Sequence, residues 1–123
     1  MAETLYDEVD DDFFARLVTA FYHRVEIDDV LRPLYPDDLH DSKRHLTMFL
    51  EQYWGGPHAY SDERGHPRLR LRHEPFEISA EVRDAWLSAM THAVDSLSDE
   101  LTDDQREALL DYFDSASRSL RNV

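Results

Sequence analysis

The stretch from residue 49 to residue 79 holds the residues best suited to chemistry, and one histidine stands out among them. His73 ends the segment 69–73, in which leucine and arginine alternate, and Pro75 follows two positions later. A neutral imidazole in such a segment can ligate a metal ion or a haem iron. A surface histidine on a basic turn is the alternative that these residues leave open. Because the chain has no cysteine, a metal or haem has to be held by histidine, tyrosine, methionine or a carboxylate.

The chain's tyrosines and tryptophans carry polar hydrogens, and three of them lie at points where a structural role has to be weighed. Tyr22 lies at the margin of an apolar helical face, Tyr35 stands just before a proline, and Trp86 belongs to another helical pattern. Phenol O–H and indole N–H groups can donate hydrogen bonds inside an apolar site. Each residue also has a purely structural interpretation, with Tyr22 and Trp86 as core aromatics and Tyr35 as a turn tyrosine.

Arginines gather in the same stretch, although the chain as a whole is strongly acidic. The formal net charge of −14 disfavours nucleic acid and anionic membranes as partners, since both attract clustered Lys and Arg. Guanidinium groups pair bidentately with carboxylates, so these arginines suit the carboxylates of a haem edge as well as a solvated turn. Lysine is nearly absent, which indicates either genomic bias or a high-salt cytoplasm. The basic patch consists of Arg64, Arg68, Arg70 and Arg72.

The histidines do not form a zinc motif. His66 and His73 belong to no HExxH pattern, and no cysteine is available as a further ligand. The remaining histidines are therefore expected on the surface, namely His23, His40, His45, His58 and His92.

Length and hydropathy predict a single domain over residues 1–123. A chain of 123 residues has room for one hydrophobic core and little more. No apolar run approaches the roughly 20 residues that a membrane-spanning helix needs, and the first residues lack a charged-then-apolar signal pattern. We therefore expect a soluble, cytoplasmic protein with no membrane partner.

Apolar residues at helical spacing predict the elements that position these side chains. A short helical stub is expected over residues 5–9, and the aspartate run 10–12 is expected to cap the helix that follows. That helix carries apolar residues from Phe14 to Val25 and ends near residues 26–28.

The middle of the chain is predicted to hold a turn, a long helix and a polar loop. A helical turn is expected before Pro33, and the next long helix begins at residues 38–41. Gly55-Gly56-Pro57 stops that helix. Residues 58–67 are polar and are expected to form a loop, and one or two helical turns follow over 69–73.

Two further helices are predicted in the last third. Ser79 is a good N-cap for a helix that extends to Ser98, and a capped break follows over residues 99–104. Thr102 begins a capping-box pattern for the last helix, which carries apolar residues from Leu109 to Leu120. With no strand pattern that has a partner, the fold class is all-α.

A longer pattern covers most of the chain from about Phe21 onward. It comprises Phe49–Pro57, Tyr60-Ser61, Arg64–Arg70, Arg72-His73, Pro75-Phe76, Ile78-Ser79, Arg83–Leu87 and Leu109–Tyr112. In order and spacing these segments closely resemble the truncated haemoglobins, and within them the group II, or O-type, proteins.

The resemblance implies a fold and a set of site residues. The fold is a truncated globin, a two-over-two helical sandwich around haem b, with His73 as the proximal iron ligand and its other ring nitrogen donating to a backbone carbonyl. Tyr22, Tyr35 and Trp86 match the family's distal donors, and Ser42 stands where many oxygen-carrying globins have a histidine. The remaining haem contacts implied are His45, Leu46, Phe49, Tyr60, Arg70, Arg72 and Phe76.

The function implied is tight oxygen binding with slow release rather than bulk oxygen transport. Reaction with nitric oxide to give nitrate and peroxidase-like turnover are the implied enzymatic activities, with carbon monoxide as a further ligand. A reductase partner and a homodimer are left open. The alternatives are a haem-based gas sensor or redox partner module, and a haem-free acidic domain, which would leave a destabilising cavity. The chain departs from the family pattern at His45, in place of a basic residue, and at the aspartate run 10–12, in place of a Gly-Gly pair.

Overall fold

The computed structural model describes residues 4–73 and 76–123, without the side chains of Arg70 and Leu71. Within these ranges all regular structure is helical, as predicted. No helix in the described part of the chain is both long and apolar enough to cross a membrane. The elements are α1 (Leu5–Glu8), α2 (Phe13–Ile27), the 3₁₀ helix η1 (Arg32–Leu34), α3 (His40–Tyr53), α4 (Ala59–Arg64), α5 (Leu69–His73), α6 (Ala80–Ser96), the 3₁₀ helix η2 (Ser98–Glu100) and α7 (Asp103–Leu120).

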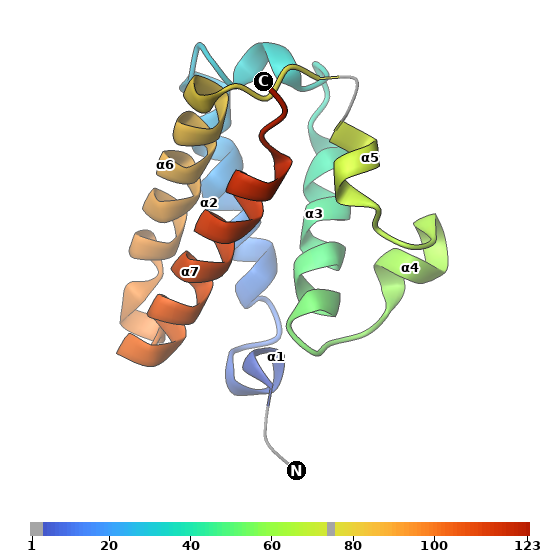
Figure 1. Ribbon diagram of the computed structural model, residues 1–123. Helices are drawn as coiled ribbons and strands as arrows, with labels where there is room; N and C mark the ends of the chain where they lie inside the picture. Colours follow the sequence, from blue (N-terminus) through green and yellow to red (C-terminus); the bar gives the residue numbers. More distant parts are fainter. Residues whose placement is uncertain (1–3, 74–75) are drawn as a thin grey trace.

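Two pairs of long helices form the body of the molecule (Figure 1). Helix α2 packs against both α3 and α6, and α6 packs in turn against α7, so α2 is the central element. The short helix α4 packs on α3, and α5 lies beside α3 and contacts α7. The end of the chain returns to the segment between α5 and α6. The arrangement is the two-over-two sandwich that the resemblance implied.

Helix α2 supplies most of the hydrophobic core, because its apolar residues recur every three or four positions and so share one face. The large side chains on that face are at most 1% exposed. Their partners come from the facing sides of α6 and α7. The central contacts involve Phe13, Phe14, Leu17, Phe21 and Val25 of α2, Met90 and Val94 of α6, and Leu109 and Phe113 of α7.

Side-chain caps fix where two of the helices begin. The Thr102 hydroxyl accepts from the Gln105 N–H, and the Gln105 side chain accepts from the Thr102 N–H, which is the predicted capping box. Ser79 caps α6 as predicted. The aspartate run behaves differently from the prediction: Asp12 occupies the N-cap position of α2, but its carboxylate makes no capping bond and lies 3.2 Å from the Arg16 guanidinium.

The break after α3 requires glycine because the α1 stub packs directly on it. Gly55 has a φ of +102°, in the left-handed region that glycine tolerates, and a Cβ there would lie 2.4 Å from Thr4 Cγ2. A Cβ on Gly56 would lie 2.7 Å from the Tyr6 ring. The Tyr6 N–H donates to the Trp54 carbonyl at 3.1 Å. The stub and the break therefore form one packed unit.

One prediction about the connecting segments is wrong, and another describes only part of what forms. Residues 58–67 are not simply a loop, because they contain helix α4. Its six residues are too few and too polar for a periodic pattern; Gln52 stabilises it by donating to Ser61 Oγ at 2.7 Å and accepting from the Ser61 N–H at 2.9 Å. The helical turn predicted before Pro33 is present, because the Arg32 N–H donates to the Asp28 carbonyl four residues earlier at 2.9 Å. A 3₁₀ turn that contains Pro33 follows it, since a proline in the first turn of a helix sacrifices no hydrogen bond.

Candidate functional site

A cavity of about 420 Å³ lies among α2, α3, α5, α6 and α7. Its walls are mainly aliphatic and aromatic side chains, which is typical of a site for a large apolar ligand. Most of the predicted site residues line it, although they come from six separate segments of the chain. Those that line it are Tyr22, Tyr35, His45, Leu46, Phe49, Tyr60, His73, Phe76 and Trp86.

His73 is held in one tautomer by its own helix. Its Nδ1 lies 2.6 Å from the carbonyl of Leu69, four residues earlier in α5. A carbonyl can only accept, so Nδ1 carries the hydrogen and Nε2 presents a lone pair. This is the arrangement that metal-ligating histidines use, in which the second ring nitrogen fixes the ring through a hydrogen bond. The carbonyl partner expected for His73 is therefore present, and Leu69 supplies it.

The C-terminal residues support the segment that follows His73, which the sequence did not indicate. Asn122 Nδ2 donates to the Phe76 carbonyl at 2.8 Å and lies 3.4 Å from the His73 carbonyl. Its Oδ1 accepts from the Ile78 N–H at 2.8 Å. One amide side chain thus ties the end of the chain to both sides of the α5–α6 connection and helps to fix where α5 sits.

The three predicted distal donors meet in one part of the cavity. The Tyr22 ring lies 5.5 Å from the Tyr35 ring in an edge-to-face arrangement, with an interplanar angle of 83°. Trp86 packs between aromatic rings of two other helices, 5.5 Å from Phe21 and 5.8 Å from Phe113. We call Tyr22, Tyr35 and Trp86 the aromatic wall. Ser42, in the position of the missing distal histidine, lines the same cavity but is not counted in the wall.

Burial keeps the phenols of the aromatic wall protonated. It raises the pKa of Tyr35 to about 12, with the neighbouring Trp86 indole opposing the shift. Burial, followed by the proximity of Tyr35, also raises the pKa of Tyr22 well above its usual range. Both hydroxyls therefore remain hydrogen-bond donors throughout the neutral pH range.

Charged residues of α3 and α4 border the opposite, more exposed part of the cavity. His45 and Arg64 both line it, and Arg64 Nη1 lies 2.9 Å from His45 Nδ1. His45 Nε2 lies 3.3 Å from a Glu63 carboxylate oxygen, and the second oxygen accepts from Arg44 at 2.8 Å. The Arg44 guanidinium lowers the pKa of Glu63. We call His45, Glu63 and Arg64 the rim.

The structure places the other predicted haem contacts unequally. Arg72 lies outside the cavity lining, because its guanidinium donates to the carbonyls of Pro67 at 2.7 Å and Arg64 at 3.0 Å. It also lies 5.9 Å from the centre of the Tyr60 ring. The side chain of Arg70 is outside the described part of the structure. Of the basic patch, Arg64 is thus the member that the structure brings to the cavity.

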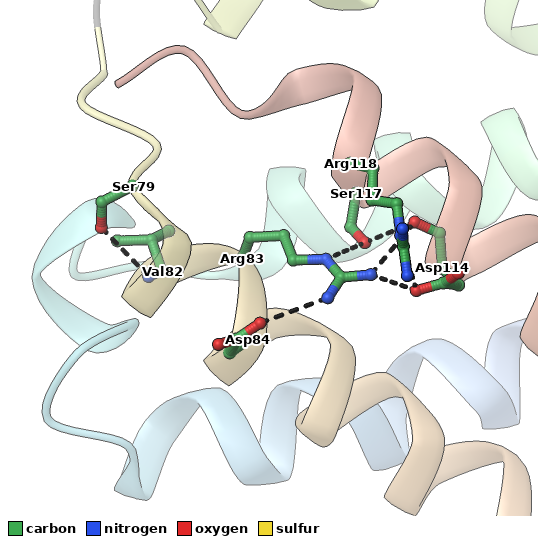
Figure 2. A network of polar contacts seen from close by, with 7 residues as sticks. All are labelled: Ser79, Val82, Arg83, Asp84, Asp114, Ser117 and Arg118. Atoms are coloured by element: carbon green, nitrogen blue, oxygen red, sulfur yellow. Dashed lines mark hydrogen bonds and ion pairs between the residues drawn. The ribbon is translucent and has the colours of Figure 1, made fainter.

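A polar network on the α6–α7 side of the cavity was missed by the sequence analysis. Figure 2 shows Arg83 of α6 reaching across to α7, where its Nε donates to Ser117 Oγ at 3.1 Å and its Nη2 pairs with the Asp114 carboxylate. Arg83 and Ser117 both line the cavity. The network joins the two helices one turn before Trp86 and so helps to fix the wall. No periodic or motif signal marks Ser117 in advance.

The donor set of the cavity fits haem. In residues 4–73 and 76–123 no cluster of three or more His, Cys, Asp or Glu side chains can hold a metal ion. The cavity instead offers the Nε2 lone pair of His73 within apolar and aromatic walls, while its second imidazole, His45, is paired with Glu63 and Arg64 at the rim. A ligand that brings its own metal inside a large apolar ring matches this set, and the rim arginine suits its carboxylates.

Comparison with known proteins agrees with this fit. Residues 4–119 match the model of the family described as bacterial-like globin. The chain belongs to the bacterial-like globin family. It is 40% identical to the group 2 truncated hemoglobin YjbI of Bacillus subtilis over 117 residues, which cover 95% of this chain and 87% of that protein.

Solved structures of haemoglobins match this globin over nearly its whole length. A thermostable hemoglobin from Thermobifida fusca is 46% identical, with a TM-score of 0.94 over 98% of each chain. The truncated oxygen-avid haemoglobin of Bacillus subtilis is 39% identical, with a TM-score of 0.91 over 98% of this chain and 100% of that one. The resemblance to group II truncated haemoglobins is thereby confirmed. The cofactor of the family is haem, and its ligands are oxygen and other diatomic gases.

Proposed function

We propose that this globin uses a haem ligated by His73 to bind oxygen tightly and release it slowly. The observation that carries the proposal is that three hydrogen-bond donors, the aromatic wall, line the same cavity as His73. When bound, haem supplies a reducible iron that takes diatomic gases. A relative from Bacillus subtilis is described as oxygen-avid, which supports the same conclusion.

In this proposal the aromatic wall sets the release rate. Tyr22 and Tyr35 stay protonated because burial raises the pKa of each phenol, and the Trp86 indole N–H is a donor at every pH. A hydrogen bond to a ligand that gains negative charge is worth about 1.5–3 kcal/mol, which corresponds to roughly 10-fold to 100-fold in dissociation rate. Two or three such donors make a poor oxygen shuttle and a good oxygen trap.

The remaining cavity residues are assigned to holding the cofactor. Leu46, Phe49 and Tyr60 supply walls from α3 and α4, and Phe76 lies at the edge with 43% of its surface exposed. His45 and Arg64 at the rim are the groups we assign to the haem carboxylates. Arg70 and Arg72 remain proposed contacts from the sequence, although Arg72 bonds to backbone carbonyls.

The finer proposal is that the retained oxygen is used against nitric oxide. Oxygen, nitric oxide and one electron from the reduced haem combine to give nitrate. Slow release lengthens the time during which nitric oxide can arrive, and a reductase is then needed to restore the electron. Mixing the oxygen-loaded protein with nitric oxide should yield nitrate, and recovery of nitrite alone would contradict the proposal. Peroxidase-like turnover is the related activity to assay alongside it.

Replacing Trp86 by phenylalanine tests the aromatic wall. The substitution keeps a ring between Phe21 and Phe113 but removes the N–H donor, so oxygen release should accelerate about 10-fold or more. Stopped-flow displacement of oxygen by carbon monoxide measures the rate.

Trp54→Phe is the matched control for that experiment. Trp54 Nε1 is the buried side-chain polar atom that lacks a hydrogen-bond partner in the described part of the chain, and Trp54 lies outside the cavity lining. Its replacement should leave the release rate unchanged. Equal rates in the parent protein and in Trp86→Phe would remove Trp86 from the donors.

A further inference from the structure

Arg32 lies in η1, and its guanidinium bonds to backbone rather than to a carboxylate. Nη1 donates to the carbonyls of Tyr35 at 3.3 Å and Pro36 at 3.1 Å, and Nη2 donates to the carbonyl of Asp37 at 3.1 Å. Three consecutive carbonyls of the segment between η1 and α3 therefore converge on one side chain. No helical N–H pairs with these carbonyls, because they lie between two helices.

The backbone of Arg32 is itself fixed from the other side. One Asp28 carboxylate oxygen accepts from the N–H groups of Val30 at 2.9 Å and Leu31 at 3.0 Å. The Arg32 N–H donates to the Asp28 carbonyl at 2.9 Å, and the Leu31 side chain is fully buried. The backbone of residues 30–32 is thus fixed to the end of α2, and from there the Arg32 side chain can hold residues 35–37 in place relative to that helix.

Negative charges around residues 35–37 add to the importance of the bonds that Arg32 makes to their carbonyls. Glu26, Asp37 and Asp38 surround the hollow that also contains Arg32, and Lys43 of α3 is the other cation there. Repulsion among three carboxylates favours outward movement of the exposed segment that carries Tyr35. Arg32 opposes this movement both as a donor to the backbone and as a positive charge in the same hollow.

We propose that Arg32 is a positioning residue that holds Tyr35 in the aromatic wall. The inference rests on the proposed donor role of Tyr35. Arg32 lies outside the cavity lining, so its influence on a ligand has to pass through Tyr35. Lysine is a poor substitute, since its donors share one nitrogen, whereas the planar guanidinium reaches separate carbonyls from two nitrogens.

Arg32→Met in the haem-loaded protein tests the proposal, because it keeps an unbranched chain and removes every donor. Hydrogen exchange of the Leu34 and Tyr35 amides should accelerate about 10-fold, since their bonds to Leu31 and Arg32 then open more often. Oxygen release should accelerate about threefold to 10-fold. This is less than the effect of losing one donor completely, because Tyr35 remains present and still donates part of the time. The carbon–oxygen stretching band of the carbon monoxide complex should broaden or split, as Tyr35 occupies more than one position.

Arg106→Met is the matched control. Arg106 donates through two nitrogens to the Asp95 carboxylate at 3.0 Å and 2.7 Å, which links α7 to α6 away from the cavity. The Arg106→Met variant should alter neither the hydrogen exchange of the Leu34 and Tyr35 amides nor the carbon–oxygen stretching band. If Arg32→Met does not fold, Arg32→Lys replaces it, with smaller changes in the same direction.

The Tyr35→Phe background separates this proposal from the one on which it rests. If Arg32 acts through Tyr35, adding Arg32→Met to Tyr35→Phe changes the band no further. An undiminished effect in that background would overturn the proposal, and so would unchanged amide exchange in Arg32→Met. If Tyr35→Phe alone leaves oxygen release unchanged, the donor role of Tyr35 fails, while the exchange rates still decide whether Arg32 holds the segment.

Discussion

The aromatic wall and the rim border the same cavity but are stabilised in opposite ways. Two members of the wall, Tyr22 and Trp86, stand on the long helices α2 and α6, and Tyr22 is 3% exposed within close-packed rings. The rim is built on α3 and the short helix α4 by ion pairs with partly exposed side chains, with Glu63 at 44% and His45 at 24%. Packing on long helices therefore positions Tyr22 and Trp86, whereas charge and hydrogen bonds position the rim.

This difference separates two tasks. A hydrogen bond in a dry wall is strong because water does not compete for the donor. Exposed ion pairs such as Arg44–Glu63 contribute little to stability and are screened by salt, but they can rearrange at little cost. We expect changes in the wall to alter ligand release, and changes around the rim to alter local stability and retention of the haem.

The largest expected effect comes from His73→Gly, which removes the proposed iron ligand that both regions surround. The intense absorption band of bound haem and its shift with carbon monoxide should be lost or strongly weakened, because the other imidazole of the cavity, His45, is paired with Glu63 and Arg64 at the rim. Added imidazole should restore the band. His66→Gly is the control, since His66 lies on the exposed α4–α5 connection, and an equal loss in both variants would mean that His73 is not the ligand.

A second, smaller effect separates wall from rim by pH. The folded-state pKa of Tyr35, about 12, exceeds the unfolded value of about 10. As the pH rises, Tyr35 therefore loses its phenol proton in the unfolded state first. The contribution of the protonated phenol to the stability of the fold is fully present below about pH 10 and is lost between about pH 10 and pH 12. The shift corresponds to a loss of about 2–3 kcal/mol in the free energy of unfolding across that window.

Chemical denaturation of the haem-loaded protein at a series of alkaline pH values measures this loss. Tyr35→Phe removes the titrating group and should flatten the decline over the same window. An identical decline in both proteins would show that Tyr35 does not titrate differently in the two states. The rim responds to acid instead. Because the pKa of Glu63 is lowered in the folded protein, its ionised carboxylate stabilises the fold at pH values above the usual carboxyl pKa, and this stabilisation is lost as the pH falls.

The sequence predicted the long helices for physical reasons and the aromatic wall by resemblance. Helices α2, α6 and α7 bury one face each, so their apolar period is visible, and the caps at Ser79 and Thr102 depend on residues within a few positions. The members of the wall were taken from the family resemblance, and the structure brings Tyr22 and Tyr35 into contact. Only the fold could show that burial keeps those phenols protonated.

The features that the sequence did not reveal depend on contacts between distant or non-periodic residues. Arg72 carries the same charge as Arg64, and nothing in their spacing shows that Arg72 turns to backbone carbonyls while Arg64 lines the cavity. Asn122 bonds to residues more than 40 positions away. Asp12 stands where a cap is expected, but Arg16 one turn later competes for its carboxylate.

The smallest expected effect comes from Gln52, which bonds to α4, and it tests whether the rim and the aromatic wall are independent. Gln52→Ala removes both bonds to Ser61 and leaves the Ser61 N–H, in the first turn of α4, without its side-chain acceptor. The free energy of unfolding should fall by about 1 kcal/mol, and the Ser61 amide should lose protection from hydrogen exchange. Gln52→Glu keeps the acceptor and should preserve much of that protection.

Because α4 carries Tyr60 and Arg64 but no member of the aromatic wall, Gln52→Ala should lose haem faster while its oxygen release stays within about twofold of the parent. A large change in oxygen release would mean that the rim and the wall are coupled.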